Sequence, residues 1–107
     1  MTASALDVTT TSDGTLVIHL RCLSADEDAT ELRRTLIHAI RHIRPSFLVL
    51  DLADVRELDP INLGALAAAC NLGDDHQVTV FVDHISAPTA MRLTAAGVPT
   101  HRIRHIL

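Results

Sequence analysis

Hydrophobic residues along the chain change their spacing several times, and each change predicts a new structural element. Between residues 15 and 22, leucine and isoleucine alternate with more polar neighbours, which predicts a strand with one wetter face. Residues 6–11 predict a weaker first strand, and Asp13-Gly14 supplies the residues of a tight turn between the two. The chain therefore begins with a predicted strand pair, in which residues 1–14 are either a weakly ordered segment or the first edge strand.

Three segments have the spacing of amphipathic helices. Over residues 26–44, apolar side chains recur every three or four positions, and Pro45 ends the helix. A second helix is predicted over residues 60–72, with Gly73 as its stop. A third is predicted over residues 87–97, with proline in its first turn and glycine at its end. Proline or glycine therefore marks at least one end of every predicted helix.

Continuous apolar runs lie between these helices. Residues 46–52 and 77–83 have the pattern of strands buried on both faces of a parallel sheet. We expect Phe47 and Phe81 to lie in adjacent central strands. Residues 101–107 predict a last, exposed strand.

The order of these elements is β-β-α-β-α-β-α-β. A chain of 107 residues is long enough for one ordinary domain and too short for two. With short connections and right-handed crossovers, the order predicts one α/β domain over residues 1–107. We expect a mixed sheet of about four to five strands, with three helices largely on one side.

Composition narrows the function classes. The formal net charge is −4 and all nine basic residues are arginine, which leaves no basic stripe for a nucleic-acid backbone. Residues 1–14 lack the features of a targeting signal, and the run of small apolar residues at 63–70 is far shorter than a membrane span. Cys22 and Cys70 lack CxxC spacing and indicate thiols in a reducing compartment. We therefore expect a cytoplasmic protein that neither binds nucleic acid nor inserts into a membrane.

The segment VRELDPINLGALAAAC, residues 55–70, changes from an acidic turn to an apolar run at Asp59-Pro60. Asp59 is a good N-cap, because its carboxylate accepts hydrogen bonds from the free N–H groups of a first helical turn. Pro60 loses no hydrogen bond at the first helical position and has the dihedral angle that a helix needs. Two interpretations stay open for this hinge: capping alone, or capping together with contact to a partner.

Other reactive side chains are better explained by structure than by chemistry. His38 and His42, like His101 and His105, have the i, i+4 spacing of metal ligands, but no cysteine or carboxylate cluster joins the first pair. Cys70 follows three alanines on a predicted core helix, where a thiol is inert. The glycines form no nucleotide-binding fingerprint. We therefore expect no enzyme, no metal site and no cofactor.

Acidic residues are the remaining candidates for a small-molecule site. In α/β proteins, ligands bind at the carboxyl ends of the strands, and a sensor needs a pocket there. An enzyme needs a nucleophile and a base within reach of each other. The polar candidates near those strand ends are Asp51, Asp54, Glu57, Asp59 and Asp83.

This order of elements, together with FLVLDLADVRELDPINLGALAAAC at residues 47–70, resembles the STAS domain. That is the fold of bacterial anti-sigma factor antagonists and of the cytoplasmic domains of sulfate transporters. The family signature is a buried strand ending in Asp-Leu, a short acidic turn, and Asp-Ser-Ser/Thr-Gly-Leu-Gly at a helix start. Here the strand also ends in Asp-Leu, and Asp59, Leu63 and Gly64 match the later part. The resemblance covers almost the whole chain.

The sequence departs from the family pattern at the position that matters most for regulation. Pro60 stands where the family carries the serine that an anti-sigma kinase phosphorylates, and Asn62 stands where it carries glycine. No serine or threonine occurs between residues 47 and 78, so no neighbouring hydroxyl takes over. A second family segment, close to Gly-Glu-Leu-Asp, falls on residues 22–25 without a match. The resemblance therefore implies an antagonist that lacks the phosphorylation switch.

The resemblance implies a non-enzymatic interaction module that binds a kinase-type anti-sigma factor around the hinge. Acidic residues there are candidates for imitating a permanently phosphorylated loop. The alternatives are a STAS subunit docked on the ATPase of a membrane transporter and a small-molecule-sensing STAS domain. The family often has one more helix after its last strand, and we expect this sequence to lack it. The apolar end IRHIL, with Ile103 and Ile106, therefore leaves a homodimer open. The expected partner-binding residues are Glu57, Asp59, Pro60, Ile61, Asn62 and Leu63.

Overall fold

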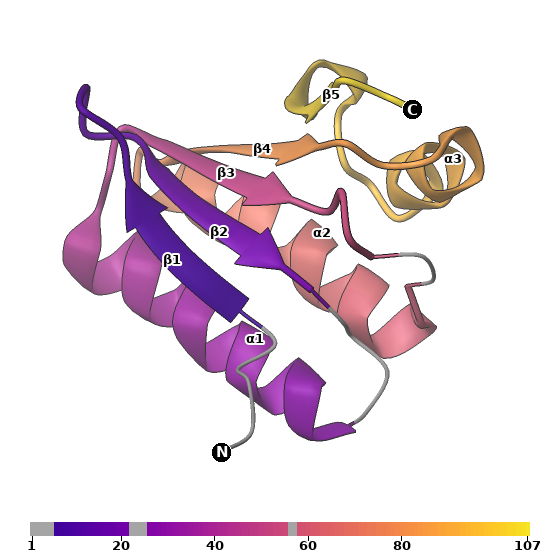
Figure 1. The fold of residues 1–107 in the computed structure, drawn as a ribbon, viewed down its shortest axis with the longest axis horizontal. Coiled ribbons are helices and arrows are strands. Elements are labelled where there is room, and N and C mark those ends of the chain that lie inside the picture. Colours follow the sequence, from indigo (N-terminus) through magenta and orange to yellow (C-terminus); the bar gives the residue numbers. More distant parts are fainter. Residues whose placement is uncertain (1–5, 22–25, 56–57) are drawn as a thin grey trace.

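A mixed β-sheet forms the frame of the protein (Figure 1). The computed structural model describes residues 6–21, 26–55 and 58–107. Within these ranges the sheet has five strands in the order β1-β2-β3-β4-β5, with β1 antiparallel to β2 and the other neighbours parallel. With three helices, this arrangement confirms the predicted fold class. The elements are β1 (Leu6–Thr10), β2 (Leu16–Leu20), α1 (Asp26–His38) with a π-helical turn (Ala39–Ile43), β3 (Phe47–Asp51), α2 (Pro60–Asp75), β4 (Thr79–Asp83), α3 (Ala87–Ala95) and β5 (Ile103–Arg104).

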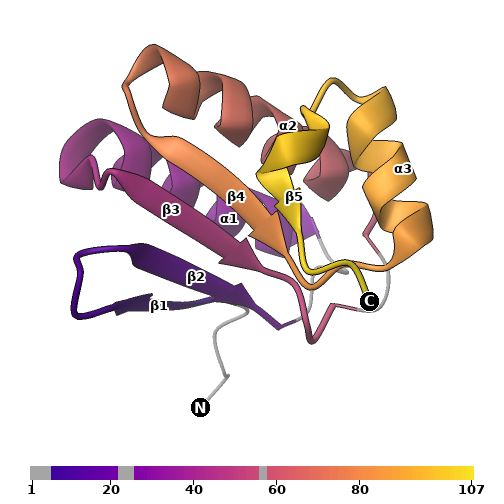
Figure 2. The ribbon, with the colours of Figure 1, turned by 90° about the horizontal axis from the view of Figure 1, so that it is seen from above.

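The helices lie largely on one side of the sheet, as predicted. α1 and α2 pack next to each other against one face, and α3 lies beyond the carboxyl end of β4 (Figure 1, Figure 2). In β2, Leu16, Ile18 and Leu20 are buried under the helices, whereas Val17 and His19 are only half-buried. This alternation confirms the wetter face predicted for that strand. None of the described helices is long and apolar enough to cross a bilayer.

The central strands are not buried on both faces, which corrects the prediction from their apolar runs. Leu48 and Leu50 of β3 are fully buried, but Phe47 is 48% exposed on the opposite face. That side chain stacks on Phe81 of β4, with ring centroids 6.1 Å apart. The two phenylalanines therefore occupy adjacent strands as predicted. Burial was overpredicted because part of the apolar run faces the side of the sheet opposite α1 and α2.

α2 continues to Asp75, so Gly73 is not the helix stop that the sequence predicted. Gly73 is buried where the helix passes the start of β4. A Cβ atom at this position would lie 2.5 Å from the Val78 carbonyl oxygen and 2.7 Å from Val80 Cγ2. Glycine therefore serves close helix-to-strand packing here, and the helix ends two residues later.

The chain end forms less strand than residues 101–107 predicted. A 3-10 turn covers Thr100–Arg102, and β5 contains only Ile103–Arg104. Pairing with β4 stops there because His105 adopts a positive φ of 53°, which turns the backbone away from the extended conformation. Ile103 is buried in the core, and Ile106 is 54% exposed.

Candidate functional site

The α2 helix begins at the predicted hinge. Asp59 is the N-cap, with an extended backbone, and its Oδ1 accepts hydrogen bonds from the Asn62 backbone N–H at 2.8 Å and from Asn62 Nδ2 at 3.1 Å. Pro60 occupies the first turn, where it leaves no helix acceptor unpaired. The capping role predicted for both hinge residues is therefore confirmed.

The predicted partner-binding residues differ in how accessible they are. Pro60 is exposed and Ile61 is 51% exposed, whereas Asn62 is fully buried. Leu63 packs against the hydrophobic core. Glu57 lies outside the described residues. Among the described residues of this set, Pro60, Ile61 and half-buried Asp59 are therefore the ones accessible to another molecule.

The outward face of α2 continues from this point without charge. The exposed residues over its first three turns are Pro60, Ile61, Gly64, Ala68 and Asn71. A surface helix of a globular protein normally carries charged and polar side chains on the face opposite the core. We call these five residues the α2 face. Small side chains and one large apolar one make it smooth and uncharged, which suits close contact with another surface.

The loop between β3 and α2 is fixed at both ends. At its start, the Ala53 N–H donates to Asp51 Oδ1 at 3.0 Å, and the Val55 N–H donates to the Leu52 carbonyl at 3.0 Å. At its end, Arg92 Nη1 of α3 donates to the Leu58 carbonyl at 2.8 Å. The position of the α2 face therefore depends on contacts from β3 and from α3.

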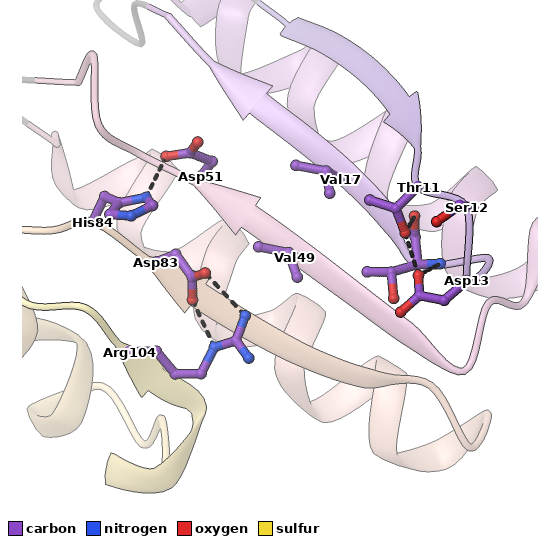
Figure 3. A pocket seen from close by; sticks show the side chains of 10 residues that line it. Thr11, Ser12, Asp13, Val17, Val49, Asp51, Asp83, His84 and Arg104 are labelled. Atoms are coloured by element: carbon purple, nitrogen blue, oxygen red, sulfur yellow. Dashed lines mark hydrogen bonds and ion pairs between the residues drawn. The ribbon is translucent and has the colours of Figure 1, made fainter.

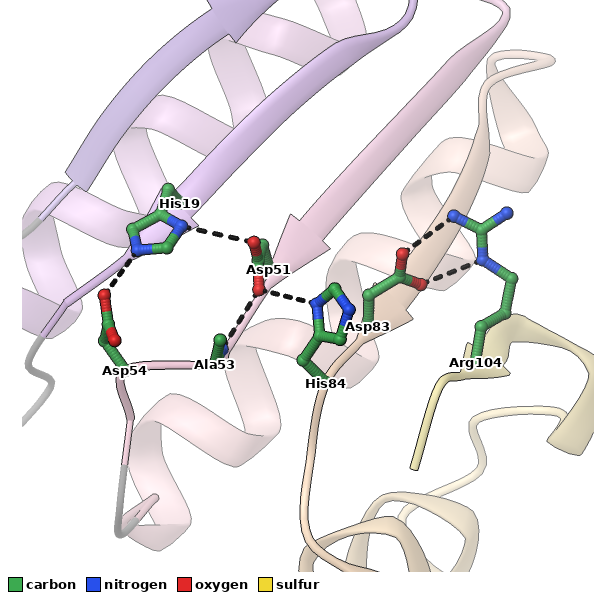
Figure 4. Close-up of polar contacts among 7 residues, drawn as sticks. All are labelled: His19, Asp51, Ala53, Asp54, Asp83, His84 and Arg104. Carbon is green, nitrogen blue, oxygen red and sulfur yellow. Dashed lines mark hydrogen bonds and ion pairs between the residues drawn. The ribbon is translucent and has the colours of Figure 1, made fainter. Parts of the chain in front are cut away.

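A second group of polar side chains lies at the carboxyl ends of the strands (Figure 4). His19 of β2 lies between two carboxylates: its Nδ1 is 3.2 Å from Asp51 Oδ2, and its Nε2 is 2.7 Å from Asp54 Oδ2. His84, just after β4, has Nδ1 3.0 Å from Asp51 Oδ1. The two aspartates were predicted candidates for this edge, and the structure connects them through His19, while His84 contacts Asp51 alone. Sequence reasoning missed both histidines. The strand alternation that put His19 on the wetter face was the available signal.

The contacts in this group shift two pKa values. The hydrogen bond to Asp54 raises the pKa of His19 above 6.5, against the effect of partial burial, and Asp51 adds to the rise. Burial alone would raise the pKa of Asp51, but hydrogen bonds from the Ala53 N–H, His84 and His19 hold it below 3.8. The raised pKa of His19 and the lowered pKa of Asp51 both favour a protonated histidine beside an ionised aspartate.

The remaining predicted aspartate of this edge pairs with an arginine. Asp83 is buried and receives two hydrogen bonds from Arg104, from Nε at 2.8 Å and from Nη2 at 2.9 Å. The guanidinium also lies 4.0 Å above the Phe81 ring. Next to this pair, the open sheet face is hollowed by about 480 Å³ (Figure 3). Thr11, Asp13, Val17, Val49, Asp51 and His84 are among the residues that line the hollow.

The other candidate side chains do not converge. His38 and His42 stack 5.3 Å apart on the surface, and His105 stacks on His84 at 5.4 Å instead of meeting His101. Within the part of the chain that the structure describes, no three His, Cys, Asp or Glu residues are placed to hold a metal ion.

Cys70 is a core residue, as predicted. It is 2% exposed, and burial raises the pKa of its thiol to about 11. Such a thiol stays protonated near neutral pH and is a poor nucleophile. Cys22 lies outside the described residues.

Comparison with known proteins identifies the family. Among solved structures, a serine-to-glutamate variant of RsbS from Moorella thermoacetica has a TM-score of 0.79 at 18% identity, covering 97% of this chain and 89% of its own. Unphosphorylated SpoIIAA, an anti-sigma factor antagonist, has 0.75 at 14%, covering 96% and 90%. A murine Solute Carrier 26 family anion transporter has 0.65 at 15%, but 87% of this chain matches only 16% of that one.

These likenesses show a shared fold. A search of curated protein sequences finds no match. The family model of the STAS domain, however, matches residues 8–102. That match includes the hinge, all of β2, β3 and β4, and β1 from its third residue, and it ends just before β5. The protein therefore belongs to the STAS domain family.

Proposed function

We propose that this protein is a non-enzymatic interaction module of the anti-sigma factor antagonist kind, which binds a kinase-type anti-sigma factor in the cytoplasm through the α2 face. The observation that carries the proposal is the chemistry of that face. It is exposed yet uncharged over three helical turns, and a half-exposed isoleucine lies at its start. Depletion of charge around an apolar anchor is typical of the centre of a protein interface.

Binding in this proposal does not depend on phosphorylation. Pro60 begins the helix without offering a hydroxyl, and the Asp59 carboxylate places a permanent negative charge beside it. Control would then come from abundance or competition.

Affinity capture with three baits tests the proposal. Ile61 and Ile106 are 51% and 54% exposed, so Ile61→Glu and Ile106→Glu place the same charge at equally exposed sites on different surfaces. From a lysate of the source organism, we expect the wild type and Ile106→Glu to recover a kinase-type anti-sigma factor and Ile61→Glu to lose it. Mass spectrometry identifies the captured proteins. Recovery by all three baits, or of a transporter ATPase subunit instead, would contradict the proposal.

A second candidate function, small-molecule sensing, is supported by the hollow on the open sheet face. Its floor is apolar, with Val17 and Val49, and its edge carries Asp51, His84 and Arg104. A ligand that binds there stabilises the folded state by mass action. A thermal-shift screen of metabolites separates the two functions, because a pure interaction module responds only to its protein partner.

A further inference from the structure

We propose that His19 is a pH-responsive clasp, which in its doubly protonated form holds residues 52–55 at the start of the β3–α2 loop through Asp54 and releases them on losing a proton. The consequence for partner binding rests on the proposed function, because this loop leads into the α2 face. The clasp itself stands on the geometry around one imidazole ring (Figure 4).

The two contacts of the ring define its protonation state. Nδ1 and Nε2 each face a carboxylate oxygen, at 3.2 Å for Asp51 and at 2.7 Å for Asp54. A neutral imidazole has a single N–H, so one of its nitrogens would present a lone pair to a carboxylate. Only the imidazolium donates to both partners at once, and such charge-assisted bonds are the stronger kind. The observed arrangement therefore fits the protonated ring.

The charged groups around His19 favour a positive ring. From β1, Asp7 is its register partner across the antiparallel pair, although that carboxylate also forms an ion pair with Arg21. From β3, Asp51 contacts the ring directly, and from the following loop Asp54 does so. Among the described residues, Arg21, which is exposed, is the cation near this end of β2.

His84 differs from His19 in the number of carboxylates that its ring contacts. It contacts Asp51 through Nδ1 alone, and its ring stacks on His105. A single N–H is enough for that contact. His19 differs because both of its nitrogens are engaged, by carboxylates from two different segments.

The clasp acts on the loop because, among the described residues, His19 is the one that holds the Asp54 side chain. Asp54 is 64% exposed at its side chain, and the 2.7 Å contact with His19 connects it to the end of β2. Beyond it, the described anchors are the Val55 N–H bond to the Leu52 carbonyl and the Arg92 bond to the Leu58 carbonyl. When His19 becomes neutral, one of its two carboxylate contacts is lost. The exposed carboxylate of Asp54 is the one that water can solvate, so residues 52–55 are the side that moves.

Nuclear magnetic resonance on the isolated protein tests the clasp without a partner. Ring signals of His19 are followed between about pH 5 and about pH 9 in the wild type, in Asp54→Asn and in the control Asp75→Asn, which neutralises an equally negative, exposed side chain at the far end of α2. We expect His19 to titrate above 6.5 in the wild type and in the control, and lower in Asp54→Asn. A wild-type midpoint at or below 6.5, or no response to Asp54→Asn, would overturn the clasp.

Amide hydrogen exchange then tests whether the loop follows the ring. After correction for intrinsic rates, we expect the protection of the Ala53 and Val55 amides to fall with the His19 titration in the wild type and to lack this step in Asp54→Asn. Protection that ignores the titration would show that the ring holds no loop. Because no partner is present, either result is independent of whether an anti-sigma factor binds.

Discussion

Two glycines of α2 give opposite predictions for the same substitution. A Cβ on Gly73 would meet a backbone oxygen and a valine methyl below 3 Å, whereas nothing lies within 4 Å of a Cβ on Gly64. We expect Gly73→Ala to lower the free energy of unfolding by about 1–3 kcal/mol through overpacking. Gly64→Ala should raise it by up to about 1 kcal/mol, because alanine favours helix. Urea denaturation followed by circular dichroism measures both, and equal shifts in one direction would refute the packing argument.

At the same scale, the sequence indicated the acidic residues of the site but not their partners. Asp51 and Asp59 could be predicted as site candidates from their positions in the sequence, since one ends a predicted strand and the other precedes a predicted helix. The contact of His19 with Asp51 spans 32 residues and depends on strand register. His84, which also contacts Asp51, has a φ of +61°, a conformation that no local pattern specified. Contacts of this kind follow from tertiary arrangement.

At the scale of elements, the start of α2 rests on one carboxylate. Asp59→Ala removes the acceptor of the Asn62 N–H and should cost about 0.5–2 kcal/mol of stability. Asp59→Asn keeps a side-chain oxygen at the cap and should stay close to the wild type. Thermal unfolding compares the two variants at one pH. An asparagine variant as unstable as the alanine variant would mean that charge, and not the cap hydrogen bond, stabilises this helix.

The two faces of β3 predict a second contrast. Phe47 lies half-exposed in a stack with Phe81, and the neighbouring Leu48 is fully buried under the helices. We expect Phe47→Ala to cost about 0.5–1.5 kcal/mol for the lost aromatic pair, and Leu48→Ala about 2–5 kcal/mol for the cavity. Urea unfolding measures both. A larger loss for Phe47→Ala would indicate that the open face is covered in solution.

This contrast also shows where pattern reasoning reaches its limit. Strand and helix positions were predictable because period 2 and period 3.6 are distinct, and because Pro45 and Pro60 mark boundaries. Burial of the second sheet face was not predictable, because an apolar run that contains Phe47 and Val49 has the same sequence whether or not a helix covers their face of the sheet. The prediction that Gly73 ends the helix was wrong for a similar reason, because glycine occurs both at helix ends and where close packing requires it.

For the whole molecule, the pKa shifts predict how stability depends on pH. The folded-state pKa of His19 is raised, so its stabilisation is fully present below 6.5 and is lost as pH rises through the folded value. The opposite holds for Asp51, whose lowered pKa gives stabilisation that is lost in acid, below 3.8. We therefore expect His19→Gln to reduce the free energy of unfolding more at about pH 6 than at about pH 9. Urea titrations at both pH values check this, and an equal loss would contradict it.

The described residues present two unlike surfaces, the α2 face and the open sheet face, and the central claim is that the α2 face binds the partner. Hydrogen–deuterium exchange of the protein alone and with the captured anti-sigma factor decides between them. We predict new protection along Pro60–Asn71 and none across Phe47–Asp51 and Thr79–Asp83. Protection confined to the strands, with α2 unchanged, would contradict the account and move the interface to the open sheet face.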